Sequence, residues 1–402
     1  MEENRIQRSN DGTKISDIVA FWIFGLCNNY GYVVMLTAAN DILNSNNMNK
    51  ENLIDDRNCT FVSTGAILLA DIIPAFIIKL LSPFLPYHTT SRIFLSCLTS
   101  IFSFILVATA SSRWIVILGV TATSFSSGLG EPTFLYHSTY YDKNTISSWS
   151  SGTGAAGVVG ALSYSILRQM GLNSYNTLIL MILIPLVELS VYMKVLSSPV
   201  AISNDNSGDH IINDNNNENS PLIRRESNLS NTVLTFAEKC ALFPMLLVYI
   251  LPLSLVYFFE YYINQGLFEL IVFENISLTK EQQYYWFQVT YQIGVFIARS
   301  SVNFIKIKQT WILAIIQGVI AIFFTFEAIY LFLPSIWIVM SIILVEGFHG
   351  GLVYVNTFYR INQEVMPALK TYAMNIVALS DSFGIILAGF FAIIAHNFIC
   401  SL

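Results

Sequence analysis

The sequence predicts an all-α integral membrane protein with about 11 transmembrane helices in two halves, six and five. Three observations support this fold class. Of the 402 residues, 54% are hydrophobic and only 11% are charged, against about 25% charged residues in soluble domains. Apolar runs of about 20 residues, the length that crosses a bilayer as a helix, recur along the chain. One long polar segment, residues 197–240, divides these runs into two groups.

Eleven runs have the length of a membrane-spanning helix, and lipid leaves only helices and closed barrels as spanning structures. Their limits are 17–39, 61–81, 91–110, 114–136, 147–169, 173–196, 241–263, 282–305, 309–332, 336–358 and 371–395. Residues 1–16 form a polar, cytoplasmic tail without the apolar core of a cleaved signal peptide, so we expect the first run to remain as a helix. Residues 17–196 then form a six-helix half, and residues 241–402 form a five-helix half.

The polar segment 197–240 is too rich in Asn, Asp and Ser to bury the apolar surface that would offset the entropy of ordering. We predict that it is a disordered cytoplasmic linker between the halves. Within it, Glu218 stands four residues before the pair Leu222 and Ile223, which fits the acidic dileucine pattern. This pattern predicts a sorting motif that a coat adaptor binds in extended form.

The distribution of basic residues predicts a cytoplasmic N-terminus. With that orientation, fifteen of the 20 Lys and Arg residues fall on the cytoplasmic side or at helix ends facing it, as the positive-inside rule requires. The glycosylation sequons at Asn58 and Asn275 then fall in lumenal loops, where the transferase acts. A third sequon, at Asn228, lies in the cytoplasmic linker and should stay unmodified.

The two halves show signs of an internal repeat. A shift of 223 residues carries the starts of the first five runs to within about five residues of starts in the second half, and places Gly128 on Gly351. This pattern indicates a duplicated six-helix unit whose second copy lacks its last helix. Two such units joined by a long cytoplasmic linker resemble the major facilitator superfamily.

Several motifs resemble a closer family, the battenin family. They are FGLCNNY at 24–30, LADI at 69–72, SSGLGE at 126–131, SWSSGTG at 148–154, INQGLFEL at 263–270 and YVNTF at 354–358. The resemblance extends from about residue 21 to the end of the chain, apart from the linker and the extreme C-terminus. It implies a lysosomal or vacuolar membrane protein that is linked to lumenal pH, basic amino-acid handling and clearance of glycerophosphodiesters. The animal proteins end in a prenylation box with cysteine fourth from the end, whereas Cys400 is third, so we expect no lipid anchor.

Residues 152–157 fit the pattern G-x-G-x-x-G, but no β-strand precedes them, so a dinucleotide site is not expected. Ser148, Gly152, Ala156 and Gly160 instead recur every four residues. Such a stripe of small residues lets a neighbouring membrane helix approach closely. We therefore predict a helix contact here.

Ionisable residues inside the predicted spans are the first candidates for function, because each costs at least about 2.5 kcal/mol at the bilayer centre. Asp71, Glu346 and Asp381 lie near the middle of their helices, Glu131 lies toward the cytoplasmic end and Glu260 toward the lumen. Arg299 is the only basic residue well inside a span, and structural pairing of an acid with it is the alternative. A carboxylate in a low dielectric favours its neutral form, which suits proton coupling.

Other polar residues complete the candidate transport cavity. Asn28, Asn29 and Tyr30 interrupt the first span at mid-depth, where adjacent amides need partners or water. His349 follows Glu346 by three residues on one helical face and could relay a proton, because imidazole titrates near about pH 6.5. The alternative is a helix kinked at its glycines, with the histidine bonded to a backbone carbonyl. The predicted cavity comprises Asn28, Asn29, Tyr30, Asp71, Glu131, Glu260, Arg299, Glu346, His349 and Asp381.

Residues 264–281 mix apolar side chains with Glu269 and Glu274, which predicts an amphipathic lumenal helix lying on the membrane. The five cysteines show no CxxC and no repeated spacing, which argues against a disulfide framework or a zinc site. The sequence also lacks a nucleophile elbow, paired catalytic carboxylates in a soluble segment and a phosphate loop. We expect no enzymatic activity, no cofactor, no metal and no nucleic-acid partner.

The buried acids and amides favour a secondary transporter with alternating access, embedded in the lipid bilayer. Such a protein moves a small-molecule substrate, and the acids are candidate groups for coupling to protons. The resemblance implies a glycerophosphodiester as substrate, whereas the surplus of acids favours a cation such as a basic amino acid. A further alternative is a non-transporting membrane organiser, or regulator of arginine transport, whose linker recruits trafficking proteins.

Overall fold

The computed structural model describes residues 14–45, 63–82, 88–138, 140–141, 144–197, 236–301 and 305–402. These residues form helices and no β-strand. The chain divides into two compact units: unit 1 comprises Met1–Leu53 and Ala70–Val200, and unit 2 comprises Ile54–Leu69 and Ala201–Leu402. Most of the predicted linker, with Glu218, Leu222 and Ile223, lies outside the described residues, as does Asn58.

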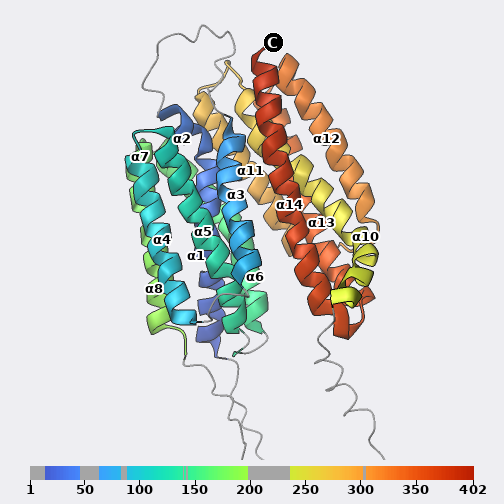
Figure 1. Cartoon of the computed structure of the whole chain (residues 1–402). Helices are drawn as coiled ribbons and strands as arrows, with labels where there is room; N and C mark the ends of the chain where they lie inside the picture. The colour runs from blue at the N-terminus through green and yellow to red at the C-terminus, as the bar shows by residue number, and fades with distance from the viewer. Residues whose placement is uncertain are drawn as a thin grey trace, which may run out of the picture. The chain divides into compact units, whose positions relative to one another are not determined.

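Unit 1 contains α1 (Ile15–Thr37), α2 (Ala39–Ser45), α4 (Thr89–Thr109), α5 (Arg113–Ser138), α6 (Asn144–Gln169), α7 (Ser174–Leu180) and α8 (Leu183–Lys194). The long helices run lengthwise beside one another (Figure 1), and α1 packs along α6 while α4 packs along α5. The sixth predicted span is two helices in sequence, α7 and α8. An aromatic core joins α1 to α5, where the rings of Phe24 and Phe134 stack at 4.6 Å.

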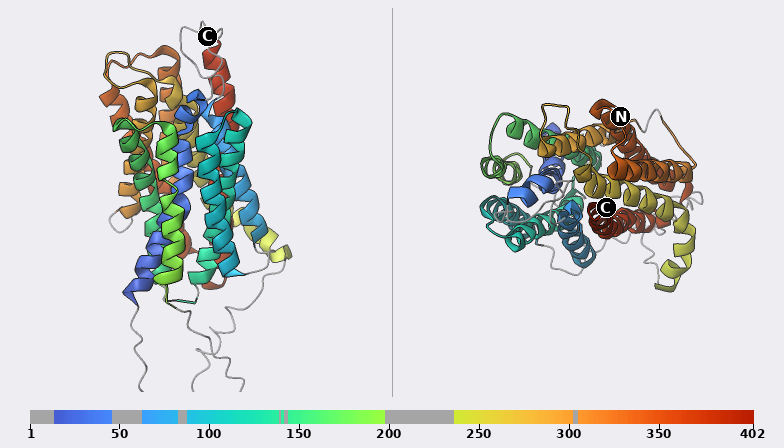
Figure 2. Two further views of the ribbon diagram at one scale, coloured as in Figure 1. Left: turned by 90° about the vertical axis from the view of Figure 1, so that its left-hand side faces the viewer. Right: turned by 90° about the horizontal axis from the view of Figure 1, so that it is seen from above.

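Unit 2 contains α10 (Phe236–Tyr262), the π-helical turn η2 (Ile263–Leu267), the 3₁₀ turn η3 (Phe268–Leu270), α11 (Lys280–Ser300), α12 (Thr310–Tyr330), α13 (Ile336–Glu364) and α14 (Pro367–Cys400). Within it, α10 packs along α14 and α11 along α13, and the view from above shows the long helices nearly end-on (Figure 2). The remaining helix, α3 (Thr64–Leu81), is shared: residues 64–69 belong to unit 2 and residues 70–81 to unit 1.

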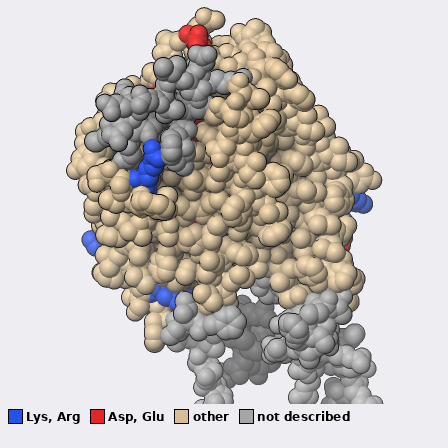
Figure 3. Space-filling view, turned by 45° about the horizontal axis from the view of Figure 1, so that its top comes forward, with Lys and Arg blue, Asp and Glu red and all other residues tan. Residues whose placement is uncertain are grey.

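Each predicted span coincides with helical residues to within a few positions. Eight helical stretches of the described residues are long and apolar enough to cross a membrane, namely those at Ile15–Thr37, Thr64–Leu81, Thr89–Thr109, Ser174–Lys194, Leu242–Leu270, Thr310–Tyr330, Ile336–Glu364 and Tyr372–Cys400. Large apolar side chains such as Trp114, Ile315 and Phe326 are exposed. The face in Figure 3 carries few charged side chains among its described residues. These features indicate a surface that contacts lipid.

The predicted stripe of small residues on α6 is confirmed as a helix contact. The hydroxyl of Ser148 donates to the carbonyl of Ile18 at 2.6 Å. A Cβ on Gly152 would collide with the backbone carbonyl of Trp22, and one on Gly160 would lie 3.1 Å from Val33. Only small residues therefore allow α6 to approach α1 this closely.

The internal repeat is present in the packing. A Cβ on Gly128 would lie 2.7 Å from the Cα of Ala75, where α5 meets α3. A Cβ on Gly351 would lie 2.6 Å from the Cβ of Ala298, where α13 meets α11. Both contacts are related by the shift of 223 residues found in the sequence. The same glycine thus permits the same helix contact in each unit.

Two sequence-based expectations were wrong. Residues 264–281 are not one amphipathic helix on the membrane surface: they comprise η2, η3, an irregular stretch and the start of α11. Leu267, Phe268 and Glu269 are each at most 1% exposed, because Glu269 bonds to groups inside unit 2. The scattered cysteines also gave no sign of a disulfide, but Cys400 is disulfide-bonded, whereas Cys27 and Cys97 are free.

Candidate functional site

In unit 1, a side chain of α5 bonds to the backbone of α3 beside the predicted site residue Asp71. The amide of Ala75 donates to the hydroxyl oxygen of Ser124 at 2.8 Å, and that hydroxyl donates to the carbonyl of Asp71. Ser124 therefore binds the two backbone groups that pair with each other in a regular helix. Pro74, inside α3, removes one further donor from the same turn.

The carboxylate of Asp71 is fully buried, and neither of its oxygens has a hydrogen-bond partner within the described parts of the chain. An unpaired charge at this depth would cost several kcal/mol, about 2.5 or more. Glu131 differs, because Lys79 binds it at 2.7 Å with both side chains about a third exposed. Of these two acids, Asp71 thus lacks a hydrogen-bond partner among the described residues, whereas Glu131 is explained by an ion pair.

The polar residues of α1 point in different directions rather than toward one cavity. The amide nitrogen of Asn28 donates to the carbonyl of Ser127 on α5 at 3.3 Å. Asn29 donates to Gly25 of its own helix at 3.1 Å, and Tyr30 bonds to Ser163 on α6 at 2.6 Å. Consecutive helical residues are turned by about 100°. Asn28 and Tyr30 therefore tie α1 to two different neighbouring helices.

In unit 2, Glu260 lies at the centre of a buried polar cluster. The hydroxyl of Tyr291, on α11, donates to Oε1 of Glu260, on α10. Oε2 has no hydrogen-bond partner within the described residues. Gly350, on α13, faces this carboxylate, and a Cβ there would collide with it. The glycine thus makes room for the acid inside the unit.

Arg299 belongs to the same cluster. Its Nη2 donates to the hydroxyl of Tyr257 at 3.2 Å, and its guanidinium lies 4.5 Å from the ring centre of Tyr354, in the range of a cation–π contact. Glu260 and Arg299 interact electrostatically, and the charge of Asp381 on α14 also acts on Glu260. The Nε atom of Arg299 has no hydrogen-bond partner among the described residues.

Glu346 is fully buried on α13 and accepts a hydrogen bond from Nε2 of Gln317, on α12, at 3.1 Å. Its Oε2 lacks a partner in the described part of the chain, and its electrostatic neighbours are Glu260 and Tyr291. His349 instead bonds through Nδ1 to the carbonyl of Val345 at 2.8 Å. No contact shown by the described residues joins His349 to Glu346, so the proton relay between them stays a prediction.

The structure therefore gathers Glu260, Arg299, Asp381 and Glu346 within unit 2, and it places Asn28, Asn29, Tyr30, Asp71 and Glu131 separately in unit 1. Sequence reasoning missed the uncharged partners, above all Gln317 and Tyr291. A tyrosine or glutamine in a span carries no charge, so only its position against a buried acid identifies it. The described residues contain no group of three or more His, Cys, Asp or Glu that could hold a metal ion.

Solved structures with a similar arrangement of helices are transporters. The chain resembles the crystal structure of a bacterial homolog to the human lysosomal transporter Spinster, with a TM-score of 0.62 and 14% identity over 94% of this chain and 82% of that chain. It also resembles a D-xylose-proton symporter, with a TM-score of 0.61 and 11% identity over 95% of this chain and 90% of that one. These likenesses define the fold: the chain is an all-α membrane protein of the major facilitator type.

Sequence comparison gives the family. The CLN3 protein family matches residues 19–402. Battenin of Canis lupus familiaris is 43% identical over 100% of this chain and 95% of its own length. Protein BTN1 of Yarrowia lipolytica is 36% identical over 95% of this chain and 94% of its own. The chain belongs to the CLN3 (battenin) family, as its motifs predicted, and is a membrane transporter-like protein.

Proposed function

We propose that this chain is an alternating-access transporter, rather than an enzyme, that exports small metabolites across the lysosomal or vacuolar membrane. Coupling to protons makes it a contributor to lumenal pH homeostasis. The observation that carries the proposal is the tyrosine-lined cluster of unit 2. There a buried guanidinium, Arg299, has an unpaired donor, and the buried carboxylates Glu260 and Glu346 each have an unpaired acceptor among the described residues.

The chemistry of the cluster fits a glycerophosphodiester, the substrate that the family resemblance suggests. A phosphodiester carries one negative charge, and a guanidinium with free N–H groups is a strong partner for it. The hydroxyl groups of glycerol are matched by carboxylate and tyrosine oxygens, which Glu260 and Tyr257 supply. Arg299 is then the residue that binds the phosphate.

The excess of acids over Arg299 supports a second candidate substrate, a basic amino acid such as arginine, which Glu260 would bind. The two candidates differ in their response to Arg299→Gln. This substitution should abolish uptake of a phosphodiester and spare uptake of a cation. A non-transporting organiser, the remaining alternative, predicts no uptake of either compound by the unmodified protein.

We propose Glu346 as the residue that binds the proton coupled to transport. It is fully buried, receives one hydrogen bond from Gln317, and interacts electrostatically with Glu260. When one of these acids binds a proton, the charge of the other acid, which a substrate would contact, also changes. Asp381, whose charge also acts on Glu260, is the second choice.

The test is uptake into proteoliposomes with a panel of labelled metabolites, with and without a pH gradient. In Glu346→Gln the side chain keeps its shape but cannot titrate, so gradient-driven uptake should be lost while substrate exchange without a gradient survives. Asp381→Asn is measured in parallel. If both variants show the same gradient-driven uptake as the unmodified protein, these acids are not part of the mechanism.

Glu327 provides a matched control. It is another buried acid of unit 2 with one unpaired oxygen among the described residues. Its other oxygen accepts a hydrogen bond from the backbone amide of Leu333 at 3.1 Å, which closes the turn after α12. Glu327→Gln should lower thermal stability without changing how transport depends on the pH gradient. A loss of coupling in this variant would show that the assay reports stability rather than proton transfer.

A further inference from the structure

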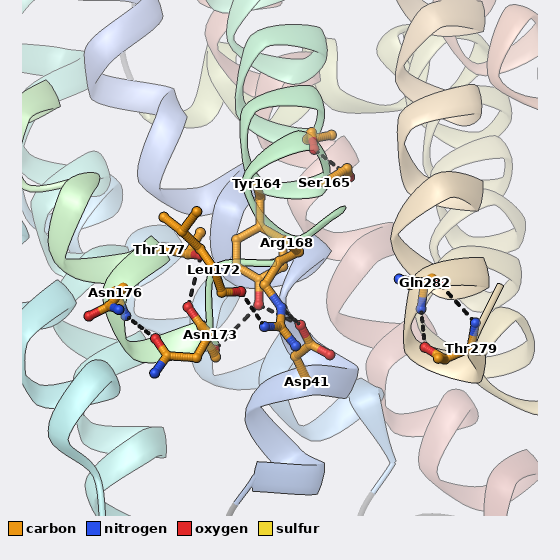
Figure 4. Close-up of polar contacts among 12 residues, drawn as sticks. Asp41, Tyr164, Ser165, Arg168, Leu172, Asn173, Asn176, Thr177, Thr279 and Gln282 are labelled. Atoms are coloured by element: carbon orange, nitrogen blue, oxygen red, sulfur yellow. Dashed lines mark hydrogen bonds and ion pairs between the residues drawn. The ribbon is translucent and has the colours of Figure 1, made fainter. Parts of the chain in front are cut away.

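Each unit contains an acid–base pair with a buried carboxylate at the end of one of its long helices. In unit 1, Nε of Arg168, near the end of α6, lies 2.7 Å from Oδ2 of Asp41 on α2. Tyr164 donates to the same oxygen at 2.8 Å (Figure 4). In unit 2, Nδ1 of His396, near the end of α14, lies 2.9 Å from Oε1 of Glu269 on η3. The carboxylate side chains are 3% and 1% exposed.

The two pairs occupy similar places in their units, with an offset of 228 residues (269 − 41 and 396 − 168) rather than the 223 of the internal repeat. In each pair the acid and the base are 127 residues apart. The acid lies on the short segment after the first helix of its unit, α2 after α1 and η3 after α10. The base lies near the end of the helix that packs along that first helix, α6 or α14. Neither pair was singled out in the sequence, because the members are so far apart.

The pairs differ in the base and in the other donors. A guanidinium stays charged throughout the physiological range, whereas an imidazole changes charge near about pH 6.5. Glu269 also accepts from the hydroxyl of Ser63 at 2.8 Å and from the amide of Thr64 at 3.1 Å. Thr64 is the first residue of α3, so Glu269 binds a free amide at the positive end of that helix.

We propose that Glu269 and His396 form a pH-sensitive latch, which holds the start of α3 against η3 and α14 more tightly in acid than at neutral pH. Asp41 and Arg168 form its permanent counterpart in unit 1. With a protonated ring the contact is a charge-assisted pair, roughly twice as strong as a neutral hydrogen bond. The additional stabilisation is present when histidine is protonated and is lost as the pH rises and the ring becomes neutral.

Several described residues lie next to the latch. Sγ of Cys400 lies 3.8 Å from Nε2 of His396 and is disulfide-bonded, so it does not titrate. Tyr284, on α11, interacts with Glu269, and tyrosine titrates near about pH 10. Ser63, directly before α3, and Thr64, its first residue, are neutral. Among these neighbours, His396 has the side-chain type whose ordinary pKa lies closest to neutral pH.

Hydrogen exchange of the full chain in nanodiscs tests the latch at about pH 5.5 and 7.5, after correction for the intrinsic exchange rates. In the unmodified protein, protection of residues 263–271 should be about fivefold or more higher at the acidic pH. Residues 38–45, which contain Asp41, should show the same protection at both. Equal protection of residues 263–271 at the two pH values would overturn the proposal.

Substitutions that replace His396 by a residue that does not titrate distinguish the latch from a general effect of acid on the protein. His396→Gln retains a hydrogen-bond donor, and His396→Arg supplies a permanent charge, so both should abolish the pH dependence of residues 263–271. The reciprocal variant Arg168→His should give residues 38–45 a new pH dependence. An unchanged pH response in a folded His396→Gln protein contradicts the latch. If both His396 variants fail to fold, the unmodified protein and Arg168→His still decide.

Discussion

Two glycines on α6 allow the contribution of close helix packing to be measured with a single type of substitution. A Cβ on Gly152 would lie 3.1 Å from the backbone nitrogen of Leu26 and would collide with the carbonyl of Trp22. A Cβ on Gly154, two residues further on, would meet nothing within 4 Å. Gly152→Ala should therefore force α1 and α6 apart, whereas Gly154→Ala should be accommodated.

The expected magnitude follows from two opposing effects. Alanine in place of glycine favours the helix by roughly 1 kcal/mol, and this gain is common to both variants. Overpacking costs about 1–3 kcal/mol, and it applies at Gly152 because the opposing atoms are backbone. The difference between the variants is therefore about 1–3 kcal/mol. At about 2–4 °C per kcal/mol, their thermal midpoints should differ by about 2–12 °C.

The measurement is thermal unfolding of the purified protein in detergent, followed by intrinsic fluorescence. Gly160→Ala gives an intermediate case, because its Cβ would lie 3.1 Å from the side chain of Val33, which can move. We expect Gly154→Ala to be the most stable of the three, then Gly160→Ala, then Gly152→Ala. Equal stability of Gly152→Ala and Gly154→Ala would refute the close contact between α1 and α6.

Three further predictions concern topology, location and cysteine chemistry. Asn275 is exposed in the loop before α11, and both Asn275 and Asn58 should carry a glycan. A mobility shift after glycosidase treatment detects these glycans. A glycan on Asn228 would contradict the predicted orientation. Leu222→Ala combined with Ile223→Ala should increase the amount of protein at the cell surface, and unchanged endolysosomal location would contradict the sorting motif. Cys400 should appear in a disulfide-linked peptide when the protein is digested without reduction. Cys27 and Cys97, which are buried, should react with alkylating reagents only after unfolding. A free thiol at Cys400 in the native protein would contradict the disulfide bond.

The positions of the helices could be predicted because hydrophobicity and length determine them directly. An apolar run of about 20 residues has one stable structure in lipid, and the stripe from Ser148 to Gly160 has the spacing of a helix contact. The break at η2 and η3 could not be predicted in this way. Residues 264–281 alternate between apolar and acidic side chains in a manner typical of a surface helix, and the burial of Glu269 is explained by partners distant in the sequence, Ser63, Thr64 and His396.

The candidate site was predicted residue by residue, but its organisation was not. The acids and Arg299 stand out in the sequence because charge is rare in a span. Which of them converge depends on helix contacts. Glu260 and Arg299 belong to one cluster because α10 and α11 both pack against α13, whose Gly350 leaves space for the carboxylate. His349 bonds through Nδ1 to a carbonyl of its own helix, as the alternative in the sequence analysis expected, and its relay with Glu346 stays a prediction.

Ser124 gives Asp71 a structural context. The chain passes from unit 2 to unit 1 between Leu69 and Ala70, one residue before Asp71. In the following turn, the carbonyl of Asp71 and the amide of Ala75 both bond to the hydroxyl of Ser124 on α5, and Pro74 removes a backbone donor. A side chain of unit 1 therefore binds this turn of α3, whereas Glu269 of unit 2 binds the start of the helix. A change in protonation at the Glu269 latch thus acts on the end of α3 that belongs to unit 2.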